Sequence, residues 1–175
     1  MDFRDKIEES LGGLENLTRK IPGYSGYKDK EMRREADRLL REQIAKVFGD
    51  EVQRLISMQG DLVSGGKLEL LEQATALEDA VRRLQTFVDR IKRAAQGYAG
   101  FFDAVKVKEE ELDALYEFDN NLLAQVDIVK SAVDDVRAAI DSGEGLPVAI
   151  SAVKRIAGDI NYLFSQRESV IAGSA

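Results

Sequence analysis

The sequence predicts an all-α protein that folds as one elongated antiparallel bundle of four to five helices with coiled-coil-like seams. Hydrophobic residues make up 44% and charged residues 33% of the 175 residues, and there are only 2 prolines. Apolar residues recur at alternating spacings of three and four, which places them on one face of a helix. The length suits a single domain over residues 1–175.

The first helix is expected from Asp2 to about Arg19. Gly12 and Gly13 weaken its middle, each by roughly 1 kcal/mol relative to alanine. We therefore expect residues 1–20 to dock more loosely than the other helices. One proline, two glycines and a serine in the next seven residues, 21–27, predict a loop.

The second helix is expected from about Lys28 to Met58. Gly60 and the pair Gly65-Gly66 are predicted to end this helix and to form a turn. The third helix has the clearest pattern, with spacings of four and three throughout: Leu70, Ala74, Leu77, Val81, Leu84, Val88, Ile91 and Ala95.

The fourth helix is predicted from Asp103 or Lys108 to Asp141. Its seam continues the same spacing: Leu112, Leu115, Asp119, Leu122, Val126, Val129, Val133, Val136 and Ile140. Glycine-rich residues 142–146 end it, and Pro147 suits the first turn of a last helix. That helix carries Ala149, Val153, Ile156, Ile160, Leu163 and Val170. Short connections predict antiparallel neighbours.

Composition excludes several kinds of chemistry. The chain has no cysteine and no histidine, so disulfides, thiolate catalysis, Cys/His zinc sites and a Ser-His-Asp triad are impossible. No cofactor is expected. The function hypothesis is accordingly non-catalytic.

Charge and hydropathy limit the partners and the location. Residues 103–144 hold four basic and twelve acidic residues, a net charge of −8, and the whole chain carries −7. An acidic chain without a basic stripe is a poor ligand for nucleic acid. No stretch resembles a signal peptide or a membrane span, which favours a cytoplasmic location.

Asp119 is the most informative single residue, because every other seam position of its helix is apolar. A buried carboxylate needs a partner. We interpret Asp119 as a buried polar layer that sets helix register, with an Arg or Lys facing it. The alternatives are an exposed position or a ligand pocket.

The densest acidic run consists of six carboxylates close together in sequence: Glu109, Glu110, Glu111, Asp113, Glu117 and Asp119. Oxygen ligands of this kind suit Mg²⁺ or Ca²⁺, but only if a second helix contributes. We favour a solvated face that complements the helix dipole, so no metal site is expected.

Two clusters are candidates for an interaction surface or an end-cap. The first cluster consists of Tyr24 and Tyr27, followed by Arg33 and Arg34 at a charged helix start. We interpret this helix start as a solvated face on which Asp37 forms salt bridges with Arg33 or Arg34, next to Arg38.

The second cluster, Tyr98, Phe101 and Phe102, lies at a glycine-flanked break between the two strongest helices. Its aromatic side chains either close the end of the core or form an exposed apolar patch.

Two phrases, residues 21–28 leading into 33–37 and residues 101–106, resemble small uncharacterised prokaryotic helical proteins. The resemblance covers only a small part of the chain and implies a helical fold but no activity. Long bundles of the spectrin-repeat kind are similar only in outline.

The sequence thus favours a protein–protein interaction or scaffold protein that binds a protein partner or a second copy of itself. A peripheral membrane or envelope-stress adaptor, using the aromatic break or the first helix, is the alternative. A carboxylate-based Mg²⁺ enzyme is a further alternative, which would need a cleft where acidic residues of another helix converge on Asp119.

Overall fold

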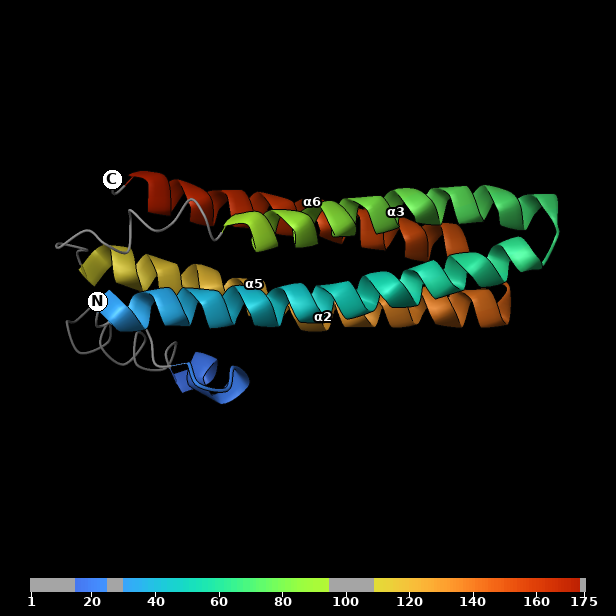
Figure 1. Cartoon of the computed structure of the whole chain (residues 1–175). Helices are drawn as coiled ribbons and strands as arrows, with labels where there is room; N and C mark the ends of the chain where they lie inside the picture. The colour runs from blue at the N-terminus through green and yellow to red at the C-terminus, as the bar shows by residue number, and fades with distance from the viewer. Residues whose placement is uncertain (1–14, 25–29, 95–108, 174–175) are drawn as a thin grey trace, which may run out of the picture.

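Four long helices make up most of the part of the chain that the structure describes: α2 (Lys30–Ser64), α3 (Leu68–Arg93), α5 (Glu109–Ser142) and α6 (Leu146–Gly173) (Figure 1). The computed structural model describes residues 15–24, 30–94 and 109–173, with only the backbone given for 30–34, 109–113 and 170–173. Residues 15–20 add a short helical stretch, and no strand occurs in the described ranges. The predicted all-α bundle is confirmed.

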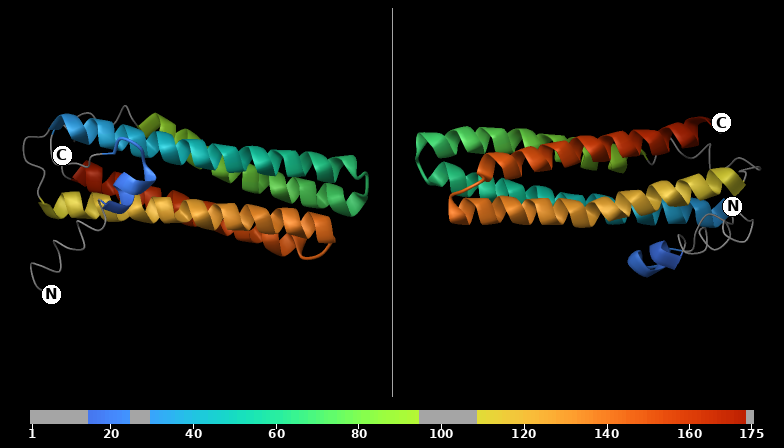
Figure 2. Two further views of the ribbon diagram at one scale, coloured as in Figure 1. Left: turned by 90° about the horizontal axis from the view of Figure 1, so that it is seen from below. Right: turned by 180° about the vertical axis from the view of Figure 1, so that it is seen from behind.

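The helices form two antiparallel hairpins, α2–α3 and α5–α6, which pack side by side (Figures 1 and 2). Going around the bundle, the neighbours are α2 with α3, α3 with α6, α6 with α5, and α5 with α2. Neighbours from different hairpins run in the same direction. The 35 residues of α2 make a rod of about 52 Å at 1.5 Å per residue.

Glycines with positive φ close both hairpins. Gly66 has a φ of 67°, and Gly143 and Gly145 have φ values of 76° and 74°. Only glycine adopts this region without strain, so the chain can reverse within a few residues. Pro147 then lies in the first turn of α6, as predicted.

Two expectations about the helices are wrong. Gly60 lies inside α2, which continues to Ser64 because Leu62, only 2% exposed, packs its last turns onto the core. Connected helices are also not always neighbours: α3 and α5 lie diagonally opposite each other across the bundle axis.

The core follows the predicted seams closely in α5 and less closely in α3. In α3, Ala80 and Phe87 are fully buried, whereas Val81 is only partly buried. Each helix of the bundle contacts two others, so the buried stripe is wider than a two-helix seam, and α5 likewise buries Leu123 and Ala132 beside its predicted seam.

An aromatic layer joins three helices in the middle of the core. Phe87 of α3 makes edge contacts with Phe48 of α2 and Phe164 of α6, at centroid distances of 5.0 and 5.7 Å. Arg90 lies over the Phe164 ring, 5.2 Å from its centroid. Such contacts fix rotamers and favour one packing arrangement.

Candidate functional site

Asp119 lies completely buried in α5, with 0% of its surface exposed. Its Oδ1 accepts a hydrogen bond from Nε of Arg167 at 2.8 Å. Arg167, near the end of α6, is also 0% exposed. The residue that faces Asp119 is therefore an arginine from the adjacent helix in its own hairpin.

The same guanidinium reaches across the bundle axis to α2. Its Nη2 donates to Oδ1 of Asp37 at 2.8 Å, and the second oxygen of Asp37 accepts from Nε of Arg41 at 2.7 Å. Asp37 is 2% and Arg41 9% exposed. We call Asp37, Arg41, Asp119 and Arg167 the buried ion network. It joins three helices, and its two carboxylates and two guanidiniums sum to zero charge.

The chemistry open to the buried ion network is limited by what it contains. Carboxylates from two helices do converge, but the cation between them is the Arg167 guanidinium. Arginine keeps its proton at any pH a protein survives, so it cannot serve as a general acid or base. Within the described part of the chain, no group of three or more acidic side chains could hold a metal ion. The arrangement is suited to fixing helix register.

The sequence did not indicate Arg167 as the partner of Asp119, nor Asp37 as the second carboxylate that binds Arg167. The prediction that Asp37 belongs to a solvated face is wrong, because Asp37 is buried. The solvated face of α2 carries Arg38, which bridges Glu35 and Glu42. A signal was present, since Arg167 continues the three-four spacing of α6 four residues after Leu163. It was overlooked because arginine is not apolar.

Surface ion pairs link the two hairpins at both of their interfaces, between α3 and α6 and between α2 and α5. Between α3 and α6, Asp79 pairs with Lys154, and Arg82 and Arg83 on its own helix also donate to it. Hydrogen bonds from Arg82, Lys154 and Arg83, in that order, hold the pKa of Asp79 well below its usual range.

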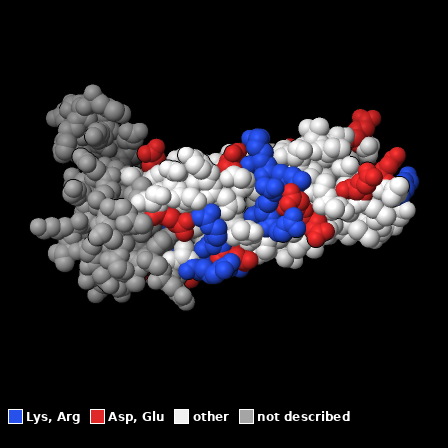
Figure 3. All heavy atoms as spheres, turned by 90° about the horizontal axis from the view of Figure 1, so that it is seen from above, with Lys and Arg blue, Asp and Glu red and all other residues white. Residues whose placement is uncertain are grey.

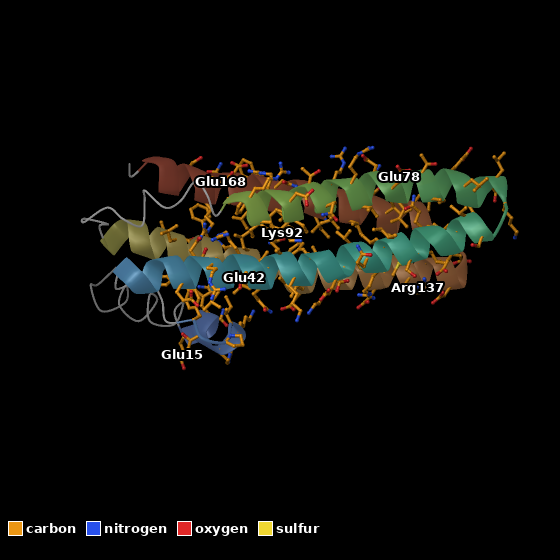
Figure 4. The ribbon with its side chains drawn as sticks, viewed as in Figure 1. Glu15, Glu42, Glu78, Lys92, Arg137 and Glu168 are labelled. Carbon is orange, nitrogen blue, oxygen red and sulfur yellow. The ribbon has the colours of Figure 1, made fainter. Side chains whose placement is uncertain are left out.

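Between α2 and α5, Arg54 pairs with Asp134, and Arg137 pairs with Asp61. The bond to Asp134 raises the pKa of Arg54, and the bond to Asp61 raises that of Arg137. Figure 4 labels Arg137 on the outside of the rod. These pairs are exposed and are worth little individually.

Of the predicted interaction or end-cap residues, Tyr24 is the one whose side chain is described. It is 2% exposed and belongs to the core, so it is not a free surface anchor. Arg33 and Arg34 lie in α2, but their side chains are outside the described set. Tyr27, Tyr98, Phe101 and Phe102 lie outside the described residues altogether.

The turn end of the bundle carries exposed aliphatic side chains from both hairpins. Leu68 and Val148 are each 75% exposed, Val63 is 51% and Leu71 is 40% exposed. We call these four residues the distal tip. Three exposed carboxylates lie within a few residues of it in sequence, Glu69, Glu72 and Glu144. In Figure 3 acidic groups gather at this right-hand end.

No family model, no curated protein and no solved structure matches the chain. Among the described residues, no helix is both long and apolar enough to cross a bilayer.

Proposed function

We propose that this protein is a non-catalytic interaction protein, a helical rod that binds another protein through its distal tip. The observation that carries the proposal is the exposure of Leu68 and Val148, one from each hairpin, at the same end of the rod. Burying an aliphatic side chain of this size is worth about 1.5–3 kcal/mol. A partner that covers both therefore gains a useful part of its binding energy there.

The composition around the distal tip indicates the kind of partner. Glu69, Glu72 and Glu144, all exposed, lie near the aliphatic side chains in sequence beside one exposed lysine, Lys67, so these four residues carry a net negative charge. Apolar anchors inside a polar rim are the usual anatomy of a protein interface. A partner with an apolar centre and basic groups would be complementary, whereas a second copy or an anionic membrane would be repelled.

The interior supports a structural role over catalysis. The four charged side chains of the buried ion network are bonded to one another and neutralise each other. An Mg²⁺ enzyme would need a metal ion between Asp119 and a carboxylate from another helix. The Arg167 guanidinium occupies the position between Asp119 and Asp37.

A site-specific photo-crosslinker tests the proposal in the native host. We would place it at Leu68 or Val148, and at Ile128 as a control, because Ile128 is 45% exposed but lies in the middle of α5. We expect a discrete protein adduct from the tip positions and none from Ile128. Leu68→Ser with Val148→Ser should abolish competition for that adduct by unlabelled protein, with unchanged melting temperature.

Two results would count against the proposal. Equal adducts from the tip and from Ile128 would mean that the tip is ordinary surface. Flotation of the purified protein with phosphatidylcholine–phosphatidylserine vesicles, lost in the Leu68→Ser, Val148→Ser variant, would assign the tip to a membrane instead.

A further inference from the structure

The outward-facing residues of α3 and α6 form one side of the rod, the side that Figure 3 shows. On each helix they recur at spacings of three and four, away from the buried positions. They are Leu68, Glu72, Thr75, Asp79, Arg82 and Thr86 on α3, and Val148, Ser151, Arg155, Gly158 and Tyr162 on α6. Asp79 binds Lys154 of α6 as well as Arg82, which places the α3 row beside α6. We call these two rows the α3–α6 face.

Charge on this side of the rod is separated along its length. A basic band in the middle has four cations and two carboxylates, a net charge of +2: Arg82, Arg83, Lys154 and Arg155 with Asp79 and Asp159. An acidic end at the distal tip has one cation and three carboxylates, a net charge of −2: Lys67, Glu69, Glu72 and Glu144. Figure 3 shows the basic side chains gathered near the middle and acidic ones at the right-hand end. The charges of the two regions are therefore equal and opposite.

The basic band and the acidic end lie at similar distances from one level of the rod. On α3, the midpoint between Glu72 and Arg82 is Leu77, two residues before Asp79. Lys154 binds Asp79, and the two helices run in the same direction. The same level on α6 therefore lies about two residues before Lys154, between its basic residues and the turn that precedes it.

A two-fold axis perpendicular to the rods at this level brings opposite charges together. It sets Glu72 of one copy against Arg82 of the other, and the basic residues of α6 against the other copy's first turn of α6. Thr75 and Ser151, both exposed and uncharged, lie close to the axis. Glu78 is the other charged residue between the two regions, and its spacing places it outside the α3 row.

We propose that the α3–α6 face binds a second copy of this chain in an antiparallel, two-fold symmetric dimer. A two-fold interface needs a surface that is complementary to itself, and equal and opposite charges on either side of the axis meet that need. Two tips repel each other, whereas a tip and a basic band attract. The antiparallel arrangement follows, because parallel rods would set each acidic end against the other.

Apolar contacts add to the charge pairing. Leu68 is 75% and Tyr162 is 68% exposed in the single chain, and the axis brings them to about the same level on opposite copies. Val148, also 75% exposed, meets the aliphatic stem of Arg155 from the other copy. The dimer thus covers exposed aliphatic and aromatic side chains that have no contact of their own kind in one copy.

The size of the face indicates a weak dimer. The α3 row is about 27 Å long at 1.5 Å per residue. Two helices with axes 8–10 Å apart make a face about 20 Å wide, so each copy buries roughly 500 Å². The total of about 1,000 Å² is near the lower limit for a specific interface. We expect dissociation in the micromolar range. The dimer goes beyond the proposed function, because it gives the distal tip a second ligand that belongs to this chain.

Charge exchange tests the pairing in the full chain. Glu72→Arg and Arg82→Glu should each weaken the dimer at least tenfold in sedimentation velocity, since each reversal affects both symmetric contacts. An equimolar mixture of the two variants should dimerise like the wild type, because both contacts become opposite in charge again. Asp127→Arg and Lys130→Glu change the net charge by the same amounts on exposed positions of α5 and should have no effect.

Two further measurements check the axis and the charge dependence. Ser151→Cys lies near the axis and should form a disulfide-linked dimer on oxidation, whereas Ser131→Cys, exposed on α5, should not. The chain has no cysteine, so no other disulfide competes. Raising the salt from about 0.1 to 1 M shortens the Debye length from about 10 to 3 Å and should weaken the wild-type dimer at least tenfold. If circular dichroism shows Arg82→Glu unfolded, Glu144→Arg with Arg155→Glu replaces the exchanged pair.

Three outcomes would overturn the proposal: a wild-type monomer at several hundred micromolar, a mixture that associates no better than the separate variants, or equal crosslinking at positions 151 and 131. The proposed function fails separately. A monomer whose tip crosslinks to a host protein would remove the dimer and keep that function, whereas a dimer without a host adduct would do the reverse.

Discussion

Replacing Arg167 by methionine removes the guanidinium that binds Asp119 of α5 and Asp37 of α2 from its place in α6. Methionine keeps much of the volume and the flexible stem but none of the five donors. Asp119 then loses its ion pair, and Asp37 keeps only its bond to Arg41. Both carboxylates stay at positions with no more than 2% exposure.

The expected loss is large because the Asp119 carboxylate would stay buried after losing the Arg167 guanidinium that binds it. Breaking a buried pair from one side typically costs about 3–5 kcal/mol. For a domain of this size, each kcal/mol lowers the melting temperature by roughly 2–4 °C, so a fall of about 6–20 °C is expected. Adding Asp119→Leu removes the charge as well and should recover a large part of that loss, since well-packed apolar residues often replace buried ion pairs without cost.

Urea unfolding followed by circular dichroism at 222 nm measures these differences. The matched control is Arg155→Met, which breaks an exposed pair with Asp159 on the same helix and should cost less than about 1 kcal/mol. A loss below about 1 kcal/mol for Arg167→Met would refute the reasoning. So would a double variant no more stable than the single one.

Three further predictions test the packing, the turns and the surface charges. Phe87→Ala should cost about 3–5 kcal/mol in urea unfolding, because it opens a cavity between two other rings; a loss under 1 kcal/mol would contradict the aromatic layer. Gly145→Ala should lower the melting temperature, because its φ of 74° strains alanine, whereas Gly158→Ala within α6 should raise it by favouring helix; effects of equal sign would contradict this. The depressed pKa of Asp79 predicts stability that is complete above its ordinary pKa and lost as pH falls through roughly 4 toward the lower folded value. Asp79→Asn should flatten that acid-side decline in thermal melts between pH 5 and 2, and an unchanged decline would show that other carboxylates cause it.

Much of the fold follows from local patterns in the sequence. The three-four spacing identifies the long helices, and the glycines at 65–66 and 143–145 mark both hairpin turns. These predictions succeed because helix periodicity and the φ of a turn depend on residues close in sequence. The predicted end of α2 near Gly60 is too early. The free energy gained by burying Leu62 exceeds the cost of one glycine inside the helix.

The sequence predicted one residue of the candidate site but not its partners. Asp119 stands out as a carboxylate in an apolar seam, but its partner could not be deduced, because several arginines and lysines were available. Arg38 and Arg41 are three residues apart on one helix, yet one bridges glutamates in solvent and the other lies in the core. Their sequence surroundings look alike.

The sequence by itself determined an all-helical rod, its two glycine turns and the presence of a polar position at Asp119. The tertiary structure alone decided that α3 and α5 lie diagonally, that Arg167 meets both aspartates, and that residues 15–24 cover α2 and α5. The physical reason is the range of the interactions. A helix face is set by neighbours three and four residues away, whereas the buried Asp37 also binds a guanidinium that comes from 130 residues further along the chain.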